Sequence, residues 1–211
     1  MLFLPNVPQI NHEARSLFFF CALALILFTT APAHAQQGPD RGLPNVTFQV
    51  GGGATVPVSP SEFTDLVDTG FNLTGGIGIP LTQELEVTFS VTYNDFPLAG
   101  DLDDLLGPDD DVDFTILAGE ANLKYNFPVE ASVMPYLTAG GGVYNSEVTI
   151  SAAGFSESDS ETDVGVNVGA GLSFPFANNV GFFVEPRYTI VFSEGDNIHY
   201  LPIRAGITLT N

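Results

Sequence analysis

The chain has 211 residues and a strongly one-sided charge, with 5 lysines and arginines against 25 aspartates and glutamates and a formal net charge of −20. Nucleic-acid binding depends on Lys and Arg side chains that neutralise phosphates, so this composition excludes a nucleic-acid partner. The length predicts a single domain that follows an N-terminal export signal.

The N-terminal residues have the three parts of a secretory signal peptide. Arg15 is followed by an apolar run over residues 17–28, and small residues lead to Ala33-His34-Ala35. A spanning helix needs about 20 apolar residues, so this run is too short for a membrane anchor. We therefore expect a signal peptide over residues 1–35, cleaved after Ala35, and an exported barrel domain over residues 36–211.

The exported part contains repeated segments in which apolar and polar residues alternate. In residues 85–94 every odd position is apolar and every even position is polar, which is typical of a β-strand with two unlike faces. The predicted strands are approximately 46–51, 71–79, 85–94, 114–127, 135–145, 163–174, 180–193 and 200–210. No window has a sustained helical period, so the sequence predicts an all-β domain with eight strands.

The predicted connections between these strands alternate in length. The long ones cover 54–69, 95–113 and 146–162, the short ones cover 81–84, 128–134 and 176–179, and 194–199 precedes the last strand. Short turns at one end and longer loops at the other are typical of outer-membrane β-barrels. An even number of antiparallel strands then places both ends of the barrel domain on the periplasmic side.

The charged residues on the polar strand faces balance one another, although the chain as a whole is acidic. They are Glu86, Glu120, Lys124, Glu185, Arg187 and Arg204. A polar face in water should share the acidic excess, whereas a narrow closed interior has to pair its charges because unpaired buried ions are costly. This balance favours a membrane barrel, with its apolar face toward lipid, over a soluble barrel with the same alternation.

We interpret these six residues as a lumen charge network. One reading is a salt-bridged plug, which we favour because an eight-stranded barrel has an interior only just wide enough for side chains. The other reading is a gate whose ion pairs rearrange to let ions pass.

The last predicted strand and a Gly-aromatic segment resemble those of a known family. Residues 135–142 read Pro-Tyr-Leu-Thr-Ala-Gly-Gly-Gly, and residues 204–211 contain Gly206 followed three residues later by Leu209. With the signal peptide and the charged interior, the chain resembles the outer-membrane β-barrel domain family of the OmpA/OmpX type. The resemblance implies an eight-stranded antiparallel up-and-down transmembrane β-barrel in the outer membrane, with Gly206 and Leu209 as its assembly signal. It also implies that the partners are outer-membrane lipid, periplasmic chaperones and the barrel-assembly machinery, and that the barrel is a monomer.

Two acidic segments could offer carboxylates to cations. The first contains Asp101, Asp103, Asp104, Asp109, Asp110, Asp111 and Asp113, and the second contains Glu157, Asp159, Glu161 and Asp163. Carboxylates suit hard divalent cations, but the first segment lacks the EF-hand spacing because Leu105 occupies its fifth position. We favour solvated, mutually repelling surface loops over weak divalent-cation binding. No phosphate-binding loop or metal-spaced His/Cys cluster appears in the sequence, so we expect no cofactor and assign no metal site.

His199 is the only histidine that follows the signal peptide. An outer-membrane lipid-modifying enzyme would have to use this residue as its base, yet no serine follows it on the same predicted strand. We therefore assign no catalytic residue. The leading hypothesis is a non-enzymatic outer-membrane barrel with a structural and surface role and acidic extracellular loops. The alternative is a narrow channel for ions or small apolar solutes, and a lipid-modifying enzyme is the third hypothesis.

Overall fold

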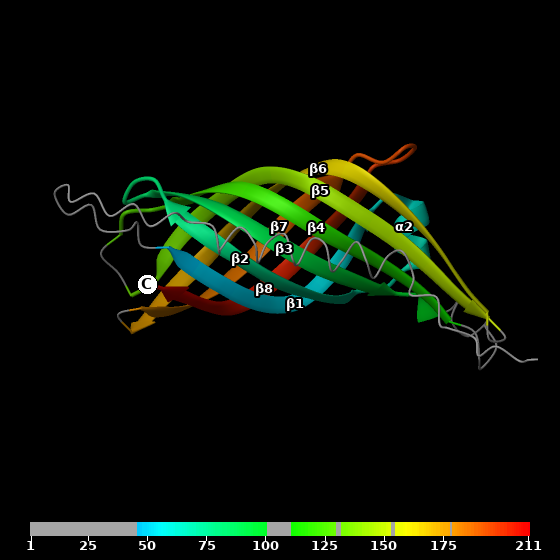
Figure 1. The fold of residues 1–211 in the computed structure, drawn as a ribbon, viewed down its shortest axis with the longest axis horizontal. Coiled ribbons are helices and arrows are strands. Elements are labelled where there is room, and N and C mark those ends of the chain that lie inside the picture. Colours follow the sequence, from blue (N-terminus) through cyan, green and yellow to red (C-terminus); the bar gives the residue numbers. More distant parts are fainter. Residues whose placement is uncertain (1–45, 101–110, 130–131, 153–154, 178) are drawn as a thin grey trace, which may run out of the picture. The chain divides into compact units, whose positions relative to one another are not determined.

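Antiparallel strands form a closed barrel in the computed structural model, which describes residues 46–100, 111–129, 132–152, 155–177 and 179–211. Each strand pairs with its neighbours in the sequence, and the last pairs with the first, so the predicted eight-stranded up-and-down barrel is confirmed (Figure 1). The strands are β1 (Thr47–Ser59), β2 (Gly70–Pro80), β3 (Leu85–Pro97), β4 (Asp111–Asn126), β5 (Met134–Ala152), β6 (Phe155–Ala177), β7 (Val180–Val191) and β8 (Ile198–Thr210).

The barrel closes where its first strand meets its last. Thr47 lies opposite Thr210, and the register continues to Ser59 opposite His199, with a shift between Pro57 and Ser59. The β2–β3 turn, residues 81–84, lies at the same end of the barrel as the start of β1 and the end of β8. We call this end the turn end and the opposite end the loop end.

The two faces of the barrel wall have the polarity of a protein surrounded by lipid. Large apolar side chains point outward and stay exposed, as with Val91 at 59% and Val164 at 63%. Polar side chains point inward and are buried, as with Asn72, Thr92 and Asn94. A protein in water places its residues the other way round. Among the described residues no helix has the length and apolarity that a membrane span requires.

The outward apolar band stops at one level toward the loop end. On β6 the outward residues change from Val164 to Thr162, and on β5 the change from Val143 to Asn145 occurs opposite it in the register. On β3 the outward Tyr93 is followed by Asp95. Because neighbouring strands change at matching positions, the band has the form of a belt, which is the pattern expected at a membrane boundary.

Strands β5 and β6 extend well past this boundary, so the predicted loop over 146–162 is wrong. Their pairing continues without a break from Met134 opposite Ser173 to Ala152 opposite Phe155. Both faces of the outer part of β6 are solvent-exposed, so its residues need no apolar alternation. The alternation that predicts a strand is therefore missing, although the backbone ladder is intact.

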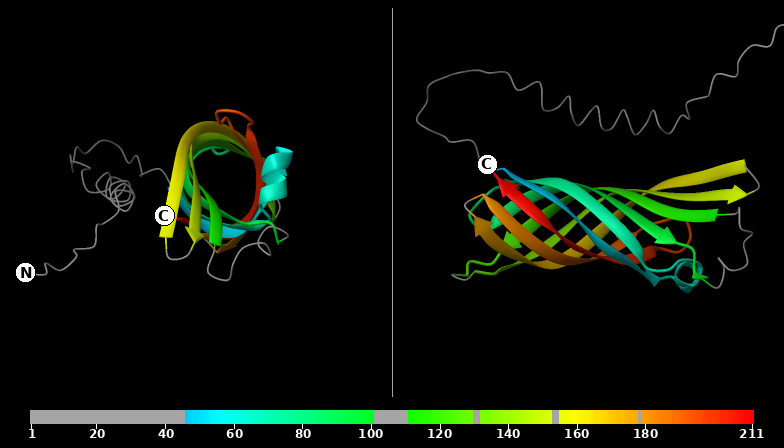
Figure 2. Two further views of the ribbon diagram at one scale, coloured as in Figure 1. Left: turned by 90° about the vertical axis from the view of Figure 1, so that its right-hand side faces the viewer. Right: turned by 90° about the horizontal axis from the view of Figure 1, so that it is seen from below.

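The predicted loop over residues 54–69 also needs correction. β1 continues through Ser59, and a six-residue helix, α2 (Ser61–Leu66), follows it. Figure 2, in the view along the barrel, shows α2 at the rim of the ring of strands. The predicted loop over residues 95–113 is shorter as well, because β3 reaches Pro97 and β4 begins at Asp111.

Candidate functional site

Four buried charged side chains meet in the middle of the lumen. We call Glu120 of β4, Glu185 and Arg187 of β7, and Arg204 of β8 the central cluster. Arg187 is 3.1 Å from Glu120 and 2.8 Å from Glu185, and Arg204 also pairs with Glu185. Because residues two apart on a strand share a face, Glu185 and Arg187 both point inward. The cluster holds two positive and two negative charges and is therefore neutral.

Glu120 accepts hydrogen bonds from side chains on several strands of the barrel. Its Oε1 accepts from the Tyr144 hydroxyl at 3.2 Å and from Asn167 Nδ2 at 3.0 Å. Its Oε2 accepts from the hydroxyls of Ser90 and Thr92, both at 3.3 Å. A buried ion is tolerated only when such bonds accompany its ion pair, and here they join β3, β4, β5 and β6.

The remaining two predicted lumen charges form a separate pair nearer the turn end. Lys124 Nζ lies 3.7 Å from Glu86 Oε2, and the two residues face each other across the β3–β4 register. Both side chains keep some exposure, 14% for Lys124 and 12% for Glu86. Lys124 also lies over the ring of Tyr136, 4.5 Å from its centroid. The six predicted residues thus all lie in the lumen, where their direct ion pairs form two groups.

Inward aromatic rings fill space that glycines on neighbouring strands leave open. The ring of Tyr144 lies against Gly165, where an added Cβ would come within 2.7 Å of Cε2. The ring of Phe183 lies against both Gly51 and Gly206 in the same way. Close packing of this kind requires glycine at these positions. Gly206, predicted as part of the assembly signal, therefore also has a packing contact inside the barrel.

An aromatic cluster covers the central cluster on the side of the loop end. We call Phe63 of α2, Phe96 of β3, Phe114 of β4 and Tyr200 of β8 the aromatic cap. The ring of Phe63 lies 5.3 Å from the rings of both Phe96 and Phe114, and Phe96 lies 5.7 Å from Tyr200. All but Phe114 are buried. The cap and the central cluster therefore fill successive levels of the lumen.

Backbone contacts hold the segment that carries Phe63 against the barrel. Val67 forms an isolated β-bridge with Leu98, and the Asp68 N–H donates to the Pro97 carbonyl at 2.8 Å. This cap was not predicted from the sequence. One signal was available, because Phe96 continues the inward series of even positions in β3 but is apolar where the preceding members are polar.

The predicted cation-binding loop falls largely outside the described residues. Asp101, Asp103, Asp104, Asp109 and Asp110 belong to the segment 101–110, which the structure does not describe. Asp111 and Asp113 belong to the start of β4. Within the described part of the chain, no group of three or more His, Cys, Asp or Glu side chains could hold a metal ion. Weak divalent-cation binding by this loop stays a prediction.

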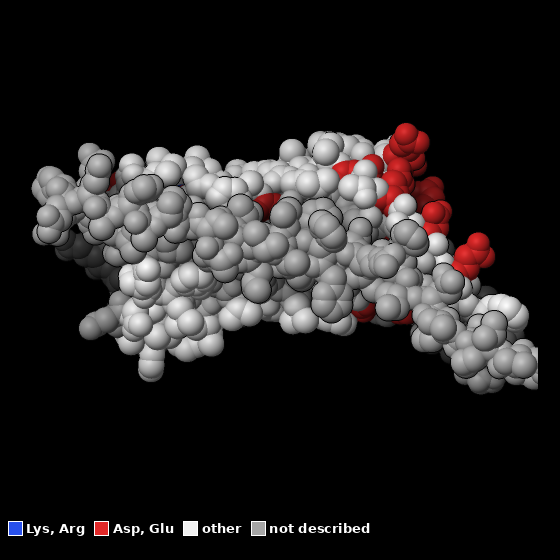
Figure 3. Space-filling model, viewed as in Figure 1, with Lys and Arg blue, Asp and Glu red and all other residues white. Residues whose placement is uncertain are grey.

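The second acidic segment belongs to the outer part of β6. Glu157, Asp159 and Glu161 are exposed there, and Asp163 is partly exposed. Figure 3 shows acidic side chains gathered at this end of the barrel.

His199 lies on the outward face of β8, away from the lumen. Its Nδ1 is 2.8 Å from the hydroxyl of Tyr188 on β7.

Comparisons with known proteins agree with this architecture. A family model described as "Outer membrane protein beta-barrel domain" matches residues 21–209. No curated protein matches the chain.

Solved structures with a similar fold include Neisserial surface protein A, with 18% identity, a TM-score of 0.55 and coverage of 78% of this chain and 96% of that one. A major outer membrane protein from Thermus thermophilus has 11% identity, a TM-score of 0.55 and coverage of 79% and 99%. Ail, the attachment invasion locus protein of Yersinia pestis, has 20% identity, a TM-score of 0.49 and coverage of 80% and 100%. The chain belongs to the outer membrane protein β-barrel domain family, and it is a protein of the outer membrane.

Proposed function

We propose that this protein is a non-enzymatic outer-membrane barrel with a closed lumen, which contributes to envelope structure and carries an acidic hairpin on the cell surface. The observation that supports this most directly is the neutral, fully buried central cluster, in which each carboxylate contacts a guanidinium. The aromatic cap adds a second obstruction at a different level.

The proposal places the turn end in the periplasm and the loop end outside the cell. Outer-membrane barrels have short periplasmic turns and longer extracellular segments. The β2–β3 connection has four residues, 81–84, whereas β5 and β6 continue far beyond the apolar band at the opposite end. The β5–β6 hairpin then projects from the cell surface.

A closed lumen is favoured over a conducting one because ions would have to displace buried ion pairs. Arg204 cannot leave Glu185 without losing its carboxylate partner, and its other contacts are the hydroxyls of Thr74 and Thr92 at 3.4 Å. Leaving a buried guanidinium without a counter-ion is strongly unfavourable. An ion would also have to pass the packed rings around Phe63.

Planar-bilayer recording distinguishes the closed barrel from the channel alternative. We expect no discrete openings from the wild-type barrel. We also expect none from Arg204→Gln or from Phe63→Ala alone, because each change leaves the other obstruction in place. The double variant is the one expected to leak. Discrete wild-type openings with a conductance altered by Arg204→Gln would contradict the closed lumen and favour the channel.

The last strand, β8, supports a proposal about the proteins that assemble the barrel. Gly206 lies on the inward face of β8 against the ring of Phe183, whereas the side chain of Leu209 points outward and is 49% exposed. An outward leucine near the end of the last strand is accessible to the barrel-assembly machinery before closure. We propose that this machinery and periplasmic chaperones receive the chain after removal of residues 1–35, and that the folded barrel is a monomer surrounded by lipid.

A further inference from the structure

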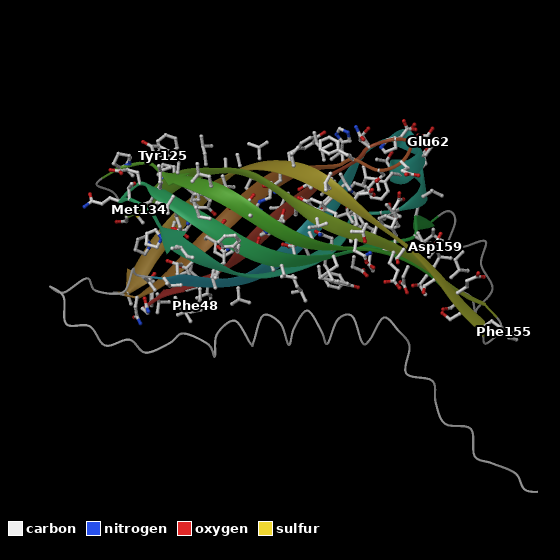
Figure 4. The ribbon with its side chains drawn as sticks, turned by 45° about the horizontal axis from the view of Figure 1, so that its top comes forward. Phe48, Glu62, Tyr125, Met134, Phe155 and Asp159 are labelled. Carbon is white, nitrogen blue, oxygen red and sulfur yellow. The ribbon has the colours of Figure 1, made fainter. Side chains whose placement is uncertain are left out.

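The outer part of β6 has one unpaired edge. On one side β6 pairs with β5 up to Phe155 opposite Ala152. On the other side its pairing with β7 begins only at Gly165 opposite Val191, with one more backbone bond from the Phe192 N–H to the Val164 carbonyl. No described strand pairs with residues 155–163 on that side. Figures 1 and 4 show this hairpin projecting beyond the other strands, with Asp159 and Phe155 along it.

An unpaired edge of this kind is a template for another strand. Its outward backbone N–H and C=O groups lack strand partners, and an added extended segment can satisfy them. The sheet behind it is stable enough to act as a template, because β5 also pairs with β4 as far out as Ser151 opposite Asp111. β6 is therefore the outermost member of a three-stranded sheet.

The acidic residues of this edge are regularly spaced along β6. Glu157, Asp159, Glu161 and Asp163 occupy every second position, so they share one face and follow each other at about 7 Å. We call them the carboxylate ladder. The intervening residues on the opposite face are Ser156, Ser158, Ser160 and Thr162.

Apolar groups lie next to the ladder on the same face. Val148 faces Asp159 and Ile150 faces Glu157 across the β5–β6 register. A hollow of about 770 Å³ is lined by these four residues, by Phe155, which is 83% exposed, and by Ser156 and Ser158 between them. Lys and Arg match such a surface, because their aliphatic stems pack on apolar groups while their charged ends reach carboxylates.

We propose that the edge of β6 from Phe155 to Asp163 binds an extended basic polypeptide segment as an added β-strand. Alternate Lys or Arg residues of that segment lie against the carboxylate ladder. Opposite charges on neighbouring strands stabilise the pairing. A second copy of this chain does not fit, because two β6 edges side by side would bring like charges together. The inference extends the proposed surface role, but its test uses purified barrel and is independent of orientation in the cell.

The test measures binding of a short synthetic peptide in which Lys and Thr alternate, to the full chain in neutral phosphatidylcholine nanodiscs. We expect saturable binding that weakens with salt, together with slowed amide exchange confined to residues 155–163. A peptide of the same sequence with N-methylated alternate amides keeps its charge but cannot form the ladder of backbone bonds. It should bind at least about tenfold more weakly, because strand addition depends on those bonds.

Two variants separate the ladder from general acidity. The combined change Glu157→Gln, Asp159→Asn, Glu161→Gln and Asp163→Asn should weaken peptide binding by at least about tenfold, since it removes four cross-strand charge pairs. Glu147→Gln, on the opposite face of β5, removes a nearby carboxylate and should change binding by less than about twofold. A mobility shift on boiling verifies that both variants are folded. Equal binding of the N-methylated peptide, equal losses in the two variants, or self-association of the barrel in place of peptide binding would each overturn the proposal.

Discussion

Replacing Glu185 with glutamine is expected to lower the free energy of unfolding of the barrel by about 3–5 kcal/mol, the range for breaking a buried ion pair from one side. Glu185 contacts both Arg187 and Arg204. Arg187 keeps Glu120 in the variant, whereas Arg204 loses its only carboxylate partner among the described ion pairs and keeps neutral acceptors alone. Glutamine has nearly the volume of glutamate, so the loss reports the missing charge and not a cavity. Urea unfolding of the barrel in lipid vesicles measures it.

The control for this prediction is Glu86→Gln in the second lumen pair. Glu86 lies 3.7 Å from Lys124, and both side chains retain some contact with solvent. An ion pair near solvent contributes about 1 kcal/mol or less, so the variant should differ little from the wild type. Equal destabilisation by the two substitutions would show that burial of the central cluster does not determine how much its ion pairs contribute to the free energy of unfolding.

The second large effect is expected from Val168→Arg on the outward face of β6. Val168 is 55% exposed and lies near the middle of the outward apolar series that runs from Val164 to Phe174. An arginine facing lipid near the bilayer midplane costs about 2–4 kcal/mol. The same substitution on a barrel surrounded by water would cost almost nothing. Urea unfolding in vesicles again gives the free energy.

A matched control uses the same strand and the same face beyond the apolar belt. Val164 is the last outward apolar residue of β6 toward the loop end, and Ser160 lies four residues beyond it. Ser160→Arg therefore places the new charge among exposed polar side chains. It should leave the free energy of unfolding within about 0.5 kcal/mol of the wild type. If Val168→Arg is equally harmless, the outward face of β6 does not meet hydrocarbon.

Alternation predicted the strands of the barrel and the two unlike faces of each strand. A strand's side chains have a period of two, so one face can be identified wherever the two faces differ in polarity. Residues 85–94 show this best, since Glu86 and Ser90 point inward and Val87 and Val91 point outward as predicted. The charge balance of the polar face then distinguished the interior from the surface.

The division of the charges into two groups required the three-dimensional register. Glu120 and Lys124 share a face of β4 but lie four residues apart, which is about 13 Å along a strand. Only the successive registers of β4 with β5, β5 with β6 and β6 with β7 decide which of them Arg187 can reach. Those registers depend on the lengths of the intervening loops, and alternation does not determine those lengths.

The aromatic cap and the outer hairpin were missed for different reasons. Phe63 is buried by strands distant in sequence, so its local sequence gives no signal of its role. Residues 155–163 form a strand with both faces in water, and such a strand lacks the contrast on which period-two prediction rests. In both cases tertiary or backbone contacts decide the structure.

Fractionation of cells into periplasm, inner membrane and outer membrane tests the central claim most directly, combined with gel mobility of the outer-membrane fraction before and after boiling. A lipid-embedded barrel closed by β1 and β8 should float with the outer membrane and resist detergent until heated, and therefore change mobility on boiling. Recovery in the periplasmic fraction, or identical mobility before and after boiling, would contradict the account.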